Sequence, residues 1–162
     1  MDFNGKHIDL ILQYVLLTAG EEDDFEDRDL GPIHLLKYVY LADLAYAQRH
    51  NGDSYTGIDW QFYKFGPWSS IVHNRIDTAL ACIHANKKIF DNNYGNDDDW
   101  TRWSLRDEGL LSQIGKKLPL VITSRIRSDV HKYGKDTPSL LDRVYKTKPM
   151  LMARPMEYLT WH

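Results

Sequence analysis

The segment that begins at Pro32 carries apolar side chains around most of a helix. Two rows of apolar residues repeat with helical spacing: Ile33, Leu36, Tyr40, Leu44 and Ala47 form one row, and Leu35, Val39, Ala42 and Tyr46 form the other. At about 3.6 residues per turn the rows lie side by side and cover more than half of the helix surface. Pro32 suits the first turn, where its missing N–H needs no partner. We therefore expect a central helix, packed on two sides, that ends before the turn-forming residues 50–54.

Asp43 lies between these two rows, where a carboxylate is unexpected. A buried charge needs hydrogen-bond partners or must be neutralised. In the structural interpretation, Asp43 accepts hydrogen bonds from backbone amides, or from an aromatic N–H or O–H, and braces the loop that follows. In the functional interpretation, it is a catalytic carboxylate with a raised pKa. Because no second acid, histidine or metal-type cluster accompanies it at helical spacing, we favour the structural interpretation.

The chain after the central helix is rich in aromatic residues and turns at Gly66-Pro67. The aromatic content of residues 60–65 favours a short strand or an extended packing segment. Pro67 is expected near the first position of a further helix. The inward face of that helix carries Val72, Ile76, Ala79, Leu80 and Ile83. We interpret Trp60 and Phe65 as parts of a satellite core, whereas Trp68 precedes the apolar face and is expected outside the core.

The central helix and the corner together resemble the core motif of the Panacea (SocA-like) antitoxin domain. In that family a K-x-x-Y-x-A helix is followed by an aromatic, strand-like piece that ends in Gly-Pro before the next helix. The resemblance lies in residues 36–43, Gly52 and residues 60–67, and continues more weakly through residues 103–109, 133–134 and 139–141. It gives a structural role to Lys37, Tyr40, Asp43, Trp60, Gly66 and Pro67. Arg106 stands where the family usually has a helix-capping Thr, and Ser104 and Asp107 are the candidates to replace that cap.

This resemblance implies a function that is exerted through a surface, without a catalytic site. Panacea-like domains neutralise a cognate toxin, usually encoded by the neighbouring gene, by binding it directly, and some SocA-like members deliver the toxin to a protease. The expected partners are therefore a toxin protein and, for the adaptor form, a protease machine. An aromatic side chain on a stiff turn loses little entropy on binding. We therefore predict that Lys64, Trp68 and His73 contact the partner.

The rest of the sequence predicts a mainly α, compact single domain over residues 1–162, with a small β-hairpin. Helices are expected over residues 4–18, about 107–118, 119–133 and 137–145, the last with Thr137 as its cap. Residues 87–90 and 100–105 are predicted to form the two strands of a hairpin around an Asn/Asp/Gly-rich tip. Pro149 and Pro155 are expected to break the C-terminal segment. No internal repeat or linker indicates a second domain.

Composition favours an intracellular globular protein. A chain of 162 residues with 43% hydrophobic content is long enough to bury one core. Its single cysteine, Cys82, excludes an internal disulfide and a cysteine-based zinc site. The first residues lack the pattern of a signal peptide, and the apolar run at residues 8–17 is too short and too interrupted to span a membrane. We therefore expect a cytoplasmic protein with no membrane partner.

Charge is unevenly distributed, although the net charge is only −3. Residues 21–27 form a dense acidic run around Phe25, whereas residues 116–148 contain nine Lys/Arg and three Asp. This asymmetry indicates either a partner of mixed charge or a contact between the two regions within the fold.

No motif predicts a metal, a cofactor or covalent catalysis, so we expect no enzyme activity. The seven histidines lack the spacing with Glu of a zincin helix. Residues 91–99 are rich in oxygen ligands, but Gly95 is out of register for an EF-hand loop and no Glu closes it. The chain has no P-loop and no G-x-G-x-x-G, and its serines lack a nucleophile elbow.

The alternative function is a DNA-binding transcriptional regulator of the winged-helix type, because helices followed by a hairpin share that outline. Against it, Asp97, Asp98 and Asp99 at the hairpin tip would repel phosphates. The preceding helix, residues 68–85, offers only Arg75 as a permanent positive charge. Nucleic acid is therefore the less favoured partner.

Overall fold

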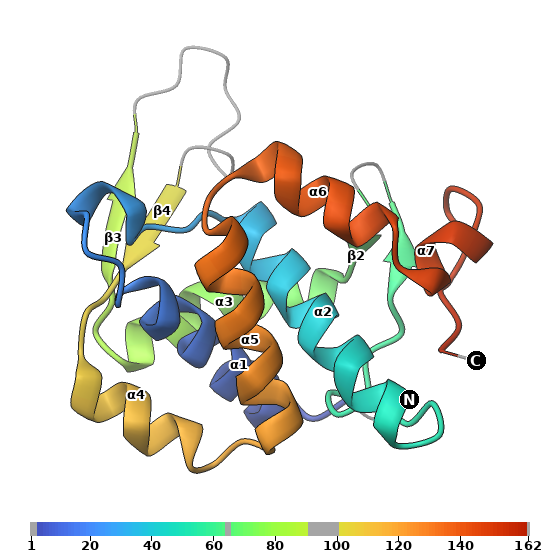
Figure 1. Ribbon diagram of the computed structural model, residues 1–162, viewed down its shortest axis with the longest axis horizontal. Coiled ribbons are helices and arrows are strands. Elements are labelled where there is room, and N and C mark those ends of the chain that lie inside the picture. Colours follow the sequence, from blue (N-terminus) through green and yellow to red (C-terminus); the bar gives the residue numbers. More distant parts are fainter. Residues whose placement is uncertain (1–2, 64–65, 91–100, 162) are drawn as a thin grey trace.

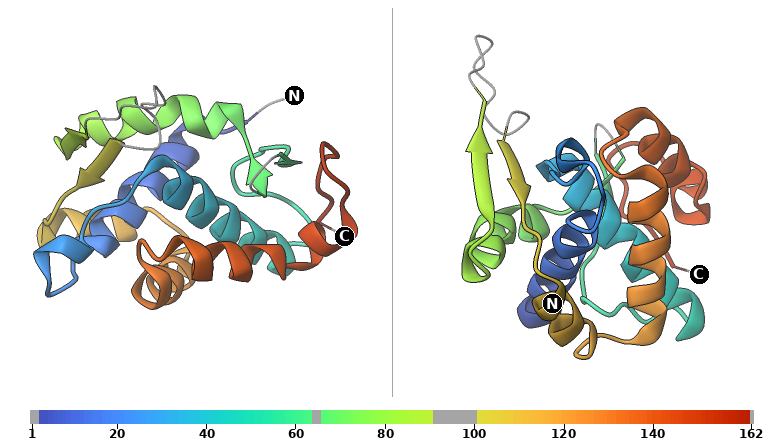
Figure 2. Two further views of the ribbon diagram at one scale, coloured as in Figure 1. Left: turned by 90° about the horizontal axis from the view of Figure 1, so that it is seen from above. Right: turned by 60° about the vertical axis from the view of Figure 1, so that its left-hand side comes forward.

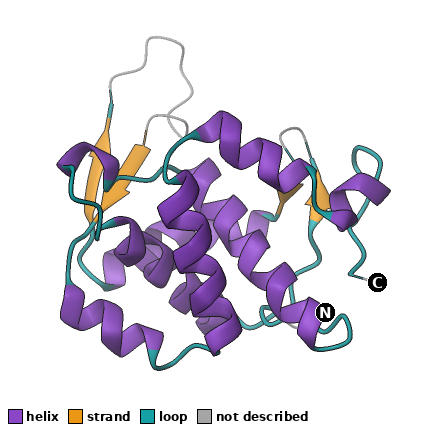
Figure 3. Ribbon diagram, in the orientation of Figure 1, coloured by secondary structure: helices purple, strands orange, loops and turns teal. Residues whose placement is uncertain are grey.

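A computed structural model describes residues 3–63, 66–90 and 101–161 of the chain. In chain order its elements are α1 (Gly5–Ala19), the 3-10 turn η1 (Phe25–Asp27), α2 (Pro32–Arg49), β1 (Gln61–Phe62), β2 (Pro67–Trp68), α3 (Ser70–Cys82), β3 (Asn86–Ile89), β4 (Thr101–Ser104), α4 (Glu108–Gly115), α5 (Leu120–Tyr133), α6 (Thr137–Tyr145) and α7 (Lys148–Met152). This confirms the predicted mainly α fold with a small hairpin (Figures 1 and 3). Among the described residues, no helix is both long and apolar enough to cross a membrane.

Helix α2 is the centre of the fold, as its two apolar rows predicted (Figure 1). Pro32 occupies its first turn, and the helix ends at Arg49, before the turn residues 50–54. It packs against α1, α3, α5 and α6. Nearly every side chain from Pro32 to Ala47 is buried. Because buried apolar area contributes roughly 25 cal/mol per Å², this helix makes a large contribution to hydrophobic stabilisation.

Helix α1 packs along α2 and contributes the second buried stretch of the core (Figure 2). Asn4 caps it by accepting a hydrogen bond from the amide of His7 at 3.0 Å. The chain leaves the helix at Gly20, where a Cβ atom would collide with the carbonyl oxygen of Leu105. Glycine is therefore needed at this position so that the segment after β4 can approach the end of α1.

The expected helix start at Pro67 is wrong, because Pro67 lies in strand β2. This strand pairs antiparallel with β1, with Phe62 opposite Pro67. Helix α3 begins three residues later, and Ser69 caps it by accepting a hydrogen bond from the amide of Val72 at 3.3 Å. A short strand at the edge of a sheet tolerates proline, since the missing N–H interrupts no continuous ladder.

The C-terminal segment adds to this small sheet. Tyr158 pairs with Gln61 as an isolated bridge on the β1 side. The amide of Leu159 donates to the carbonyl of Trp60 at 2.8 Å, so the last residues pack back onto the corner. Pro149, expected to break this segment, lies instead in the first turn of the short helix α7.

Strands β3 and β4 form the predicted hairpin and pair antiparallel over residues 86–89 and 101–104. A bridge between Leu30 and Trp103 ties β4 to the body, and Trp103 is buried there. The two strands extend beyond the helices (Figure 2). The hairpin tip, with Asp97, Asp98 and Asp99, lies outside the described residues.

Two helix caps refine the expectations from sequence. Of the two candidates for the cap of α4, Asp107 takes the position and accepts a hydrogen bond from the amide of Leu110 at 3.0 Å. Asp136, and not Thr137, caps α6 by accepting from the amide of Ser139 at 3.3 Å. Thr137 instead lies in the first turn, because the aspartate before it offers a stronger acceptor.

Candidate partner-binding site

The carboxylate of Asp43 is fully buried and accepts hydrogen bonds from the loop that follows α2. Its Oδ1 accepts from the amides of Tyr55 at 2.9 Å and Thr56 at 3.2 Å. Its Oδ2 accepts from Thr56 Oγ1 at 2.6 Å and from Trp60 Nε1 at 3.0 Å. Ser54 Oγ lies within 2.9 Å of both oxygens. These are the backbone and aromatic donors that the structural interpretation predicted, and they leave the carboxylate enclosed by donors.

Tyr40, one turn before Asp43, anchors the C-terminal part of the chain. Its hydroxyl lies 2.7 Å from Thr147 Oγ1. Because Thr147 donates its own hydroxyl proton to the carbonyl of Val144 at 2.7 Å, Tyr40 is the donor in the first bond. Burial raises the pKa of Tyr40 to about 12, so the phenol stays protonated. Its ring also meets the edge of Trp60, with 5.6 Å between centroids.

Lys37, one turn earlier still, holds strand β2. Its Nζ donates to the carbonyl of Pro67 at 2.8 Å. The side chain is only 2% exposed, and among the described residues no carboxylate forms an ion pair with it. Burial lowers the pKa of Lys37 from 10.5 to about 7. A buried lysine of this kind is expensive, so its bond to the corner is a specific feature of the site.

Lys37, Tyr40 and Asp43 therefore form one row on α2, and each side chain holds a different segment. The segments are β2, the turn between α6 and α7, and the loop before β1. Gly66 completes the corner with a φ of +107°, a left-handed conformation that favours glycine. The residues of the family-like motif thus lie together and fix the Gly-Pro corner against the central helix.

Of the predicted contact residues, the structure brings Trp68 and His73 together. Their ring centroids are 5.0 Å apart, and the ring of Tyr63 lies 6.0 Å from that of Trp68. Trp68 is half-buried and packs on the core, which corrects the expectation that it stands outside it. The correction follows from β2, whose pairing with β1 holds Trp68 beside the ring of Tyr63. Lys64 and Phe65 lie outside the described residues.

A hollow of about 260 Å³ lies beside Trp68. It is lined by Phe3, Gly57, Asp59, Gln61, Trp68, Ser69, Ser70, Ile71 and Tyr158. Three large apolar or aromatic side chains in this lining are exposed: Phe3 at 42%, Ile71 at 37% and Tyr158 at 65%. We call Phe3, Trp68, Ile71, Tyr158 and the hollow between them the aromatic groove. Among the described residues that line it, Asp59 is the only charged one.

Sequence reasoning identified Trp68 but missed the other walls of the groove. Phe3, Ile71 and Tyr158 lie far apart in the chain and share no motif. Tyr158 lies at the groove because its backbone pairs with that of Gln61. A faint indication was available for Ile71, since it falls outside the apolar face of its helix.

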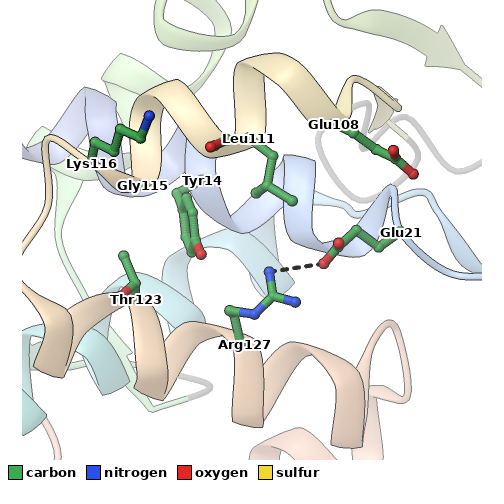
Figure 4. A pocket seen from close by; sticks show the side chains of 9 residues that line it. Tyr14, Glu21, Glu108, Leu111, Gly115, Lys116, Thr123 and Arg127 are labelled. Carbon is green, nitrogen blue, oxygen red and sulfur yellow. Dashed lines mark ion pairs between the residues drawn. The ribbon is translucent and has the colours of Figure 1, made fainter.

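A second hollow, of about 600 Å³, lies between α1, α4 and α5 (Figure 4). In it Arg127 reaches toward Glu21, with 3.0 Å between Nη1 and Oε1 (Figure 4). His131 Nδ1 lies 3.0 Å from Glu22, and Lys135 Nζ lies 3.1 Å from Asp29. The acidic run and the basic C-terminal third therefore meet in the fold, as one interpretation of their asymmetry predicted. Because Arg127 is paired with Glu21, its guanidinium is not free to bind a ligand in this hollow.

The described residues contain no group of three or more His, Cys, Asp or Glu side chains able to hold a metal ion. Comparison with protein-family models, with curated proteins and with solved structures finds no match for this chain. The resemblance to the Panacea domain therefore stays a prediction from residues.

Proposed function

We propose that this protein is an antitoxin that neutralises a cognate toxin, encoded by a neighbouring gene, by binding it directly in the cytoplasm. The family resemblance of residues 36–67 supplies the functional class. The aromatic groove supplies the binding surface and is the observation that carries the proposal. Protein partners take most of their binding energy from a few such side chains, with aromatic residues prominent among them.

The groove is suited to binding because its walls are already fixed. Trp68 follows the corner that Lys37 holds through the carbonyl of Pro67. Tyr158 is held through the backbone pairing of the C-terminal segment with β1. A preorganised surface loses little conformational entropy when a partner binds. Exposed apolar side chains such as those around the groove are typical of a protein-binding surface whose partner is not bound.

The chemistry of the groove indicates what the toxin presents there. An apolar side chain fits between Phe3, Ile71 and Tyr158. Asp59 stands at the wall with no ion pair among the described residues, so it favours a Lys or Arg beside that apolar side chain. In the adaptor form of the proposal, a protease machine is the second partner. The toxin level then falls because this protein delivers the toxin to that protease.

The charges on α3 and β3, the elements that a winged-helix regulator would place on DNA, support the regulator alternative less well. Arg75 on α3 forms a two-pronged pair with Asp9, at 2.8 and 2.9 Å. Lys87 on β3 pairs with Asp77 at 2.9 Å. Cations that already have carboxylate partners contribute less to phosphate binding.

Copurification from cells that co-express the neighbouring gene product tests the proposal. Ile71→Ser and Tyr158→Ala should each weaken the complex by about 1–3 kcal/mol while the fold survives, because both side chains are exposed. Phe25→Ala is the matched control, since Phe25 is an aromatic residue of similar exposure, 71%, on another part of the surface. Equal binding by all three variants would reject the aromatic groove as the contact. Absence of any complex would reject the antitoxin assignment.

A further inference from the structure

Two more hollows meet at Gln48, in the last turns of α2. The first, about 560 Å³, is lined by Ala45, Gln48, Arg49, Leu120, Val121, Ser124, Arg125 and Ser128. The second, about 510 Å³, is lined by Leu44, Ala47, Gln48, Asn51, Gly52, Lys148, Pro149, Thr160 and Trp161. Helix α5 borders one side, and α7 with the C-terminal segment borders the other (Figure 1). We call the two hollows together the cationic groove.

Part of the floor and rim of this groove is apolar, whereas Gln48, which both hollows share, is exposed. Leu44, Ala45 and Ala47 form a buried floor along α2. Leu120 stands on the rim in the first turn of α5 and is 79% exposed, more than any other large hydrophobic side chain in the described part of the chain. Leu151 and Met152 are also exposed on α7, beside the lining residues Lys148 and Pro149. Exposed apolar side chains beside a hollow are typical of a surface that another protein covers.

The charged side chains that line the groove in the described part of the chain are all positive. They are Arg49, Arg125 and Lys148, and no described Asp or Glu is among the lining residues. This is unexpected in a chain with 23 acidic and 20 basic residues. Arg49 and Lys148 form no ion pair among the described residues, whereas Arg125 lies 3.6 Å from Asp129. Two cations therefore remain available at the groove.

Helix electrostatics explain only one of these cations. Arg49 lies in the last turn of α2, where a positive charge is favourable because of the helix dipole. Lys148 is the first residue of α7, where the dipole gives a cation no such benefit. Exposure to solvent is enough to explain a lysine at position 148. It does not explain why no described Asp or Glu lines either hollow. The consistent feature of the groove is complementarity to an apolar and acidic surface.

We propose that the cationic groove binds an acidic amphipathic helix of a partner protein. Leucine-type side chains of that helix pack on the floor of α2 and beside Leu120, as an added helix packs into a groove between two others. Glutamate or aspartate side chains on its flanks meet Arg49 and Lys148. The groove is formed by other residues than the aromatic groove, so this binding is independent of toxin neutralisation.

The test uses a defined probe, a fluorescein-labelled peptide of about 18 residues with leucines at positions i, i+3, i+4 and i+7 and glutamates on both flanks. Fluorescence anisotropy should show saturable binding that weakens as salt rises. The double variant Arg49→Glu/Lys148→Glu should weaken binding about tenfold or more. Lys6→Glu/Lys117→Glu carries the same change in net charge at exposed positions outside the groove and should bind as the wild type does.

Four results would overturn the proposal. The first three are no saturable binding, equal binding of a peptide with lysines in place of the glutamates, and equal loss in both double variants. A fourth is a concentration-dependent dimer in sedimentation that Leu120→Ser abolishes, because a second copy of this chain would then be the occupant. If no such dimer forms, Leu120→Ser should weaken binding of the peptide about fivefold. Circular dichroism checks that the variant is folded. None of these results depends on Ile71 or Tyr158, so a failure here is separate from a failure of the antitoxin assignment.

Discussion

The indole Nε1 of Trp60 donates a hydrogen bond to Oδ2 of Asp43 at 3.0 Å, and both side chains are buried. This bond closes a set of interactions that begins at Ser54 and holds the loop between α2 and β1. The carboxylate that interrupts the apolar rows of α2 therefore holds the loop that leads into β1, whereas Lys37 holds the Gly-Pro corner.

Asp43→Ala should lower the free energy of unfolding by about 3 kcal/mol or more, since several buried donors lose their acceptor and each unsatisfied group costs about 1–3 kcal/mol. Urea denaturation measures the change. Asp53→Ala, at an exposed position in the preceding turn, is the control and should have little effect. A wild-type stability in Asp43→Ala, together with lost biological activity, would instead indicate that the carboxylate has a chemical role.

Lys37 should make stability rise with pH above neutrality. Burial lowers its pKa in the folded state to about 7, against 10.5 in the unfolded chain. Between these values the unfolded chain holds a proton that the folded protein has released, so unfolding takes up a proton and becomes less favourable as pH increases. The phenol of Tyr40, with its pKa raised to about 12, acts in the opposite direction only from about pH 10 upward.

The measurement is the urea midpoint from about pH 7 to about pH 9.5 for the wild type and Lys37→Met. The methionine keeps the length of the side chain and should remove most of the increase. Lys117→Met, at an exposed lysine, should leave it in place. A flat wild-type profile would show that Lys37 is not buried as described.

His34 should destabilise the fold as pH falls. Its Nδ1 accepts from the amide of Gly31 at 2.9 Å, so Nε2 carries the proton and donates to Thr137 Oγ1 at 2.8 Å. Burial, aided by the positive charge of Arg102, lowers the pKa of His34 from 6.5 to about 4. The unfolded chain therefore binds a proton below about pH 6.5 that the folded protein takes up only near pH 4, and stability is lost across that interval.

A comparison of His34→Gln with the wild type isolates this contribution, because the other acidic groups titrate in both proteins. The variant should lose less stability between pH 6.5 and about pH 4. Identical pH profiles for the two proteins would contradict the assignment.

Local patterns were sufficient to predict the helical frame. The apolar rows of α2 and the Asn/Asp/Gly-rich tip between the two hairpin strands each depend on neighbouring residues, and the elements predicted from them lie close to where they were expected. Pro67 was placed wrongly because its strand conformation depends on pairing with Phe62 and on Lys37, which lies in the previous helix. Sequence spacing contains no information on that contact.

The candidate site was predicted only in part for the same reason. Asp43 was recognisable as a polar residue on an apolar face, which is a local feature. The aromatic groove gathers Phe3, Ile71 and Tyr158 through tertiary contacts alone. Trp68 was identified as aromatic and near a stiff turn, but the pairing of β2 that half-buries it is not visible in the sequence.

The regulator alternative predicts binding to duplex DNA, whereas the antitoxin proposal predicts none at physiological salt. Arg75 and Lys87 are already paired with carboxylates, so few phosphate contacts are available on α3 and β3. An electrophoretic mobility shift assay measures this binding, with random-sequence duplex DNA and with the DNA upstream of the gene for this protein. Sub-micromolar, sequence-selective binding would favour the regulator.

The central claim is neutralisation of a toxin, and the most direct measurement is growth of cells that express the neighbouring gene product. Growth should stop with that product alone and recover when this protein is co-expressed. Recovery should persist with Phe25→Ala and be lost with Ile71→Ser/Tyr158→Ala at equal protein levels. A neighbouring product that is harmless by itself, or a toxin that this protein neither binds nor relieves, would contradict the claim.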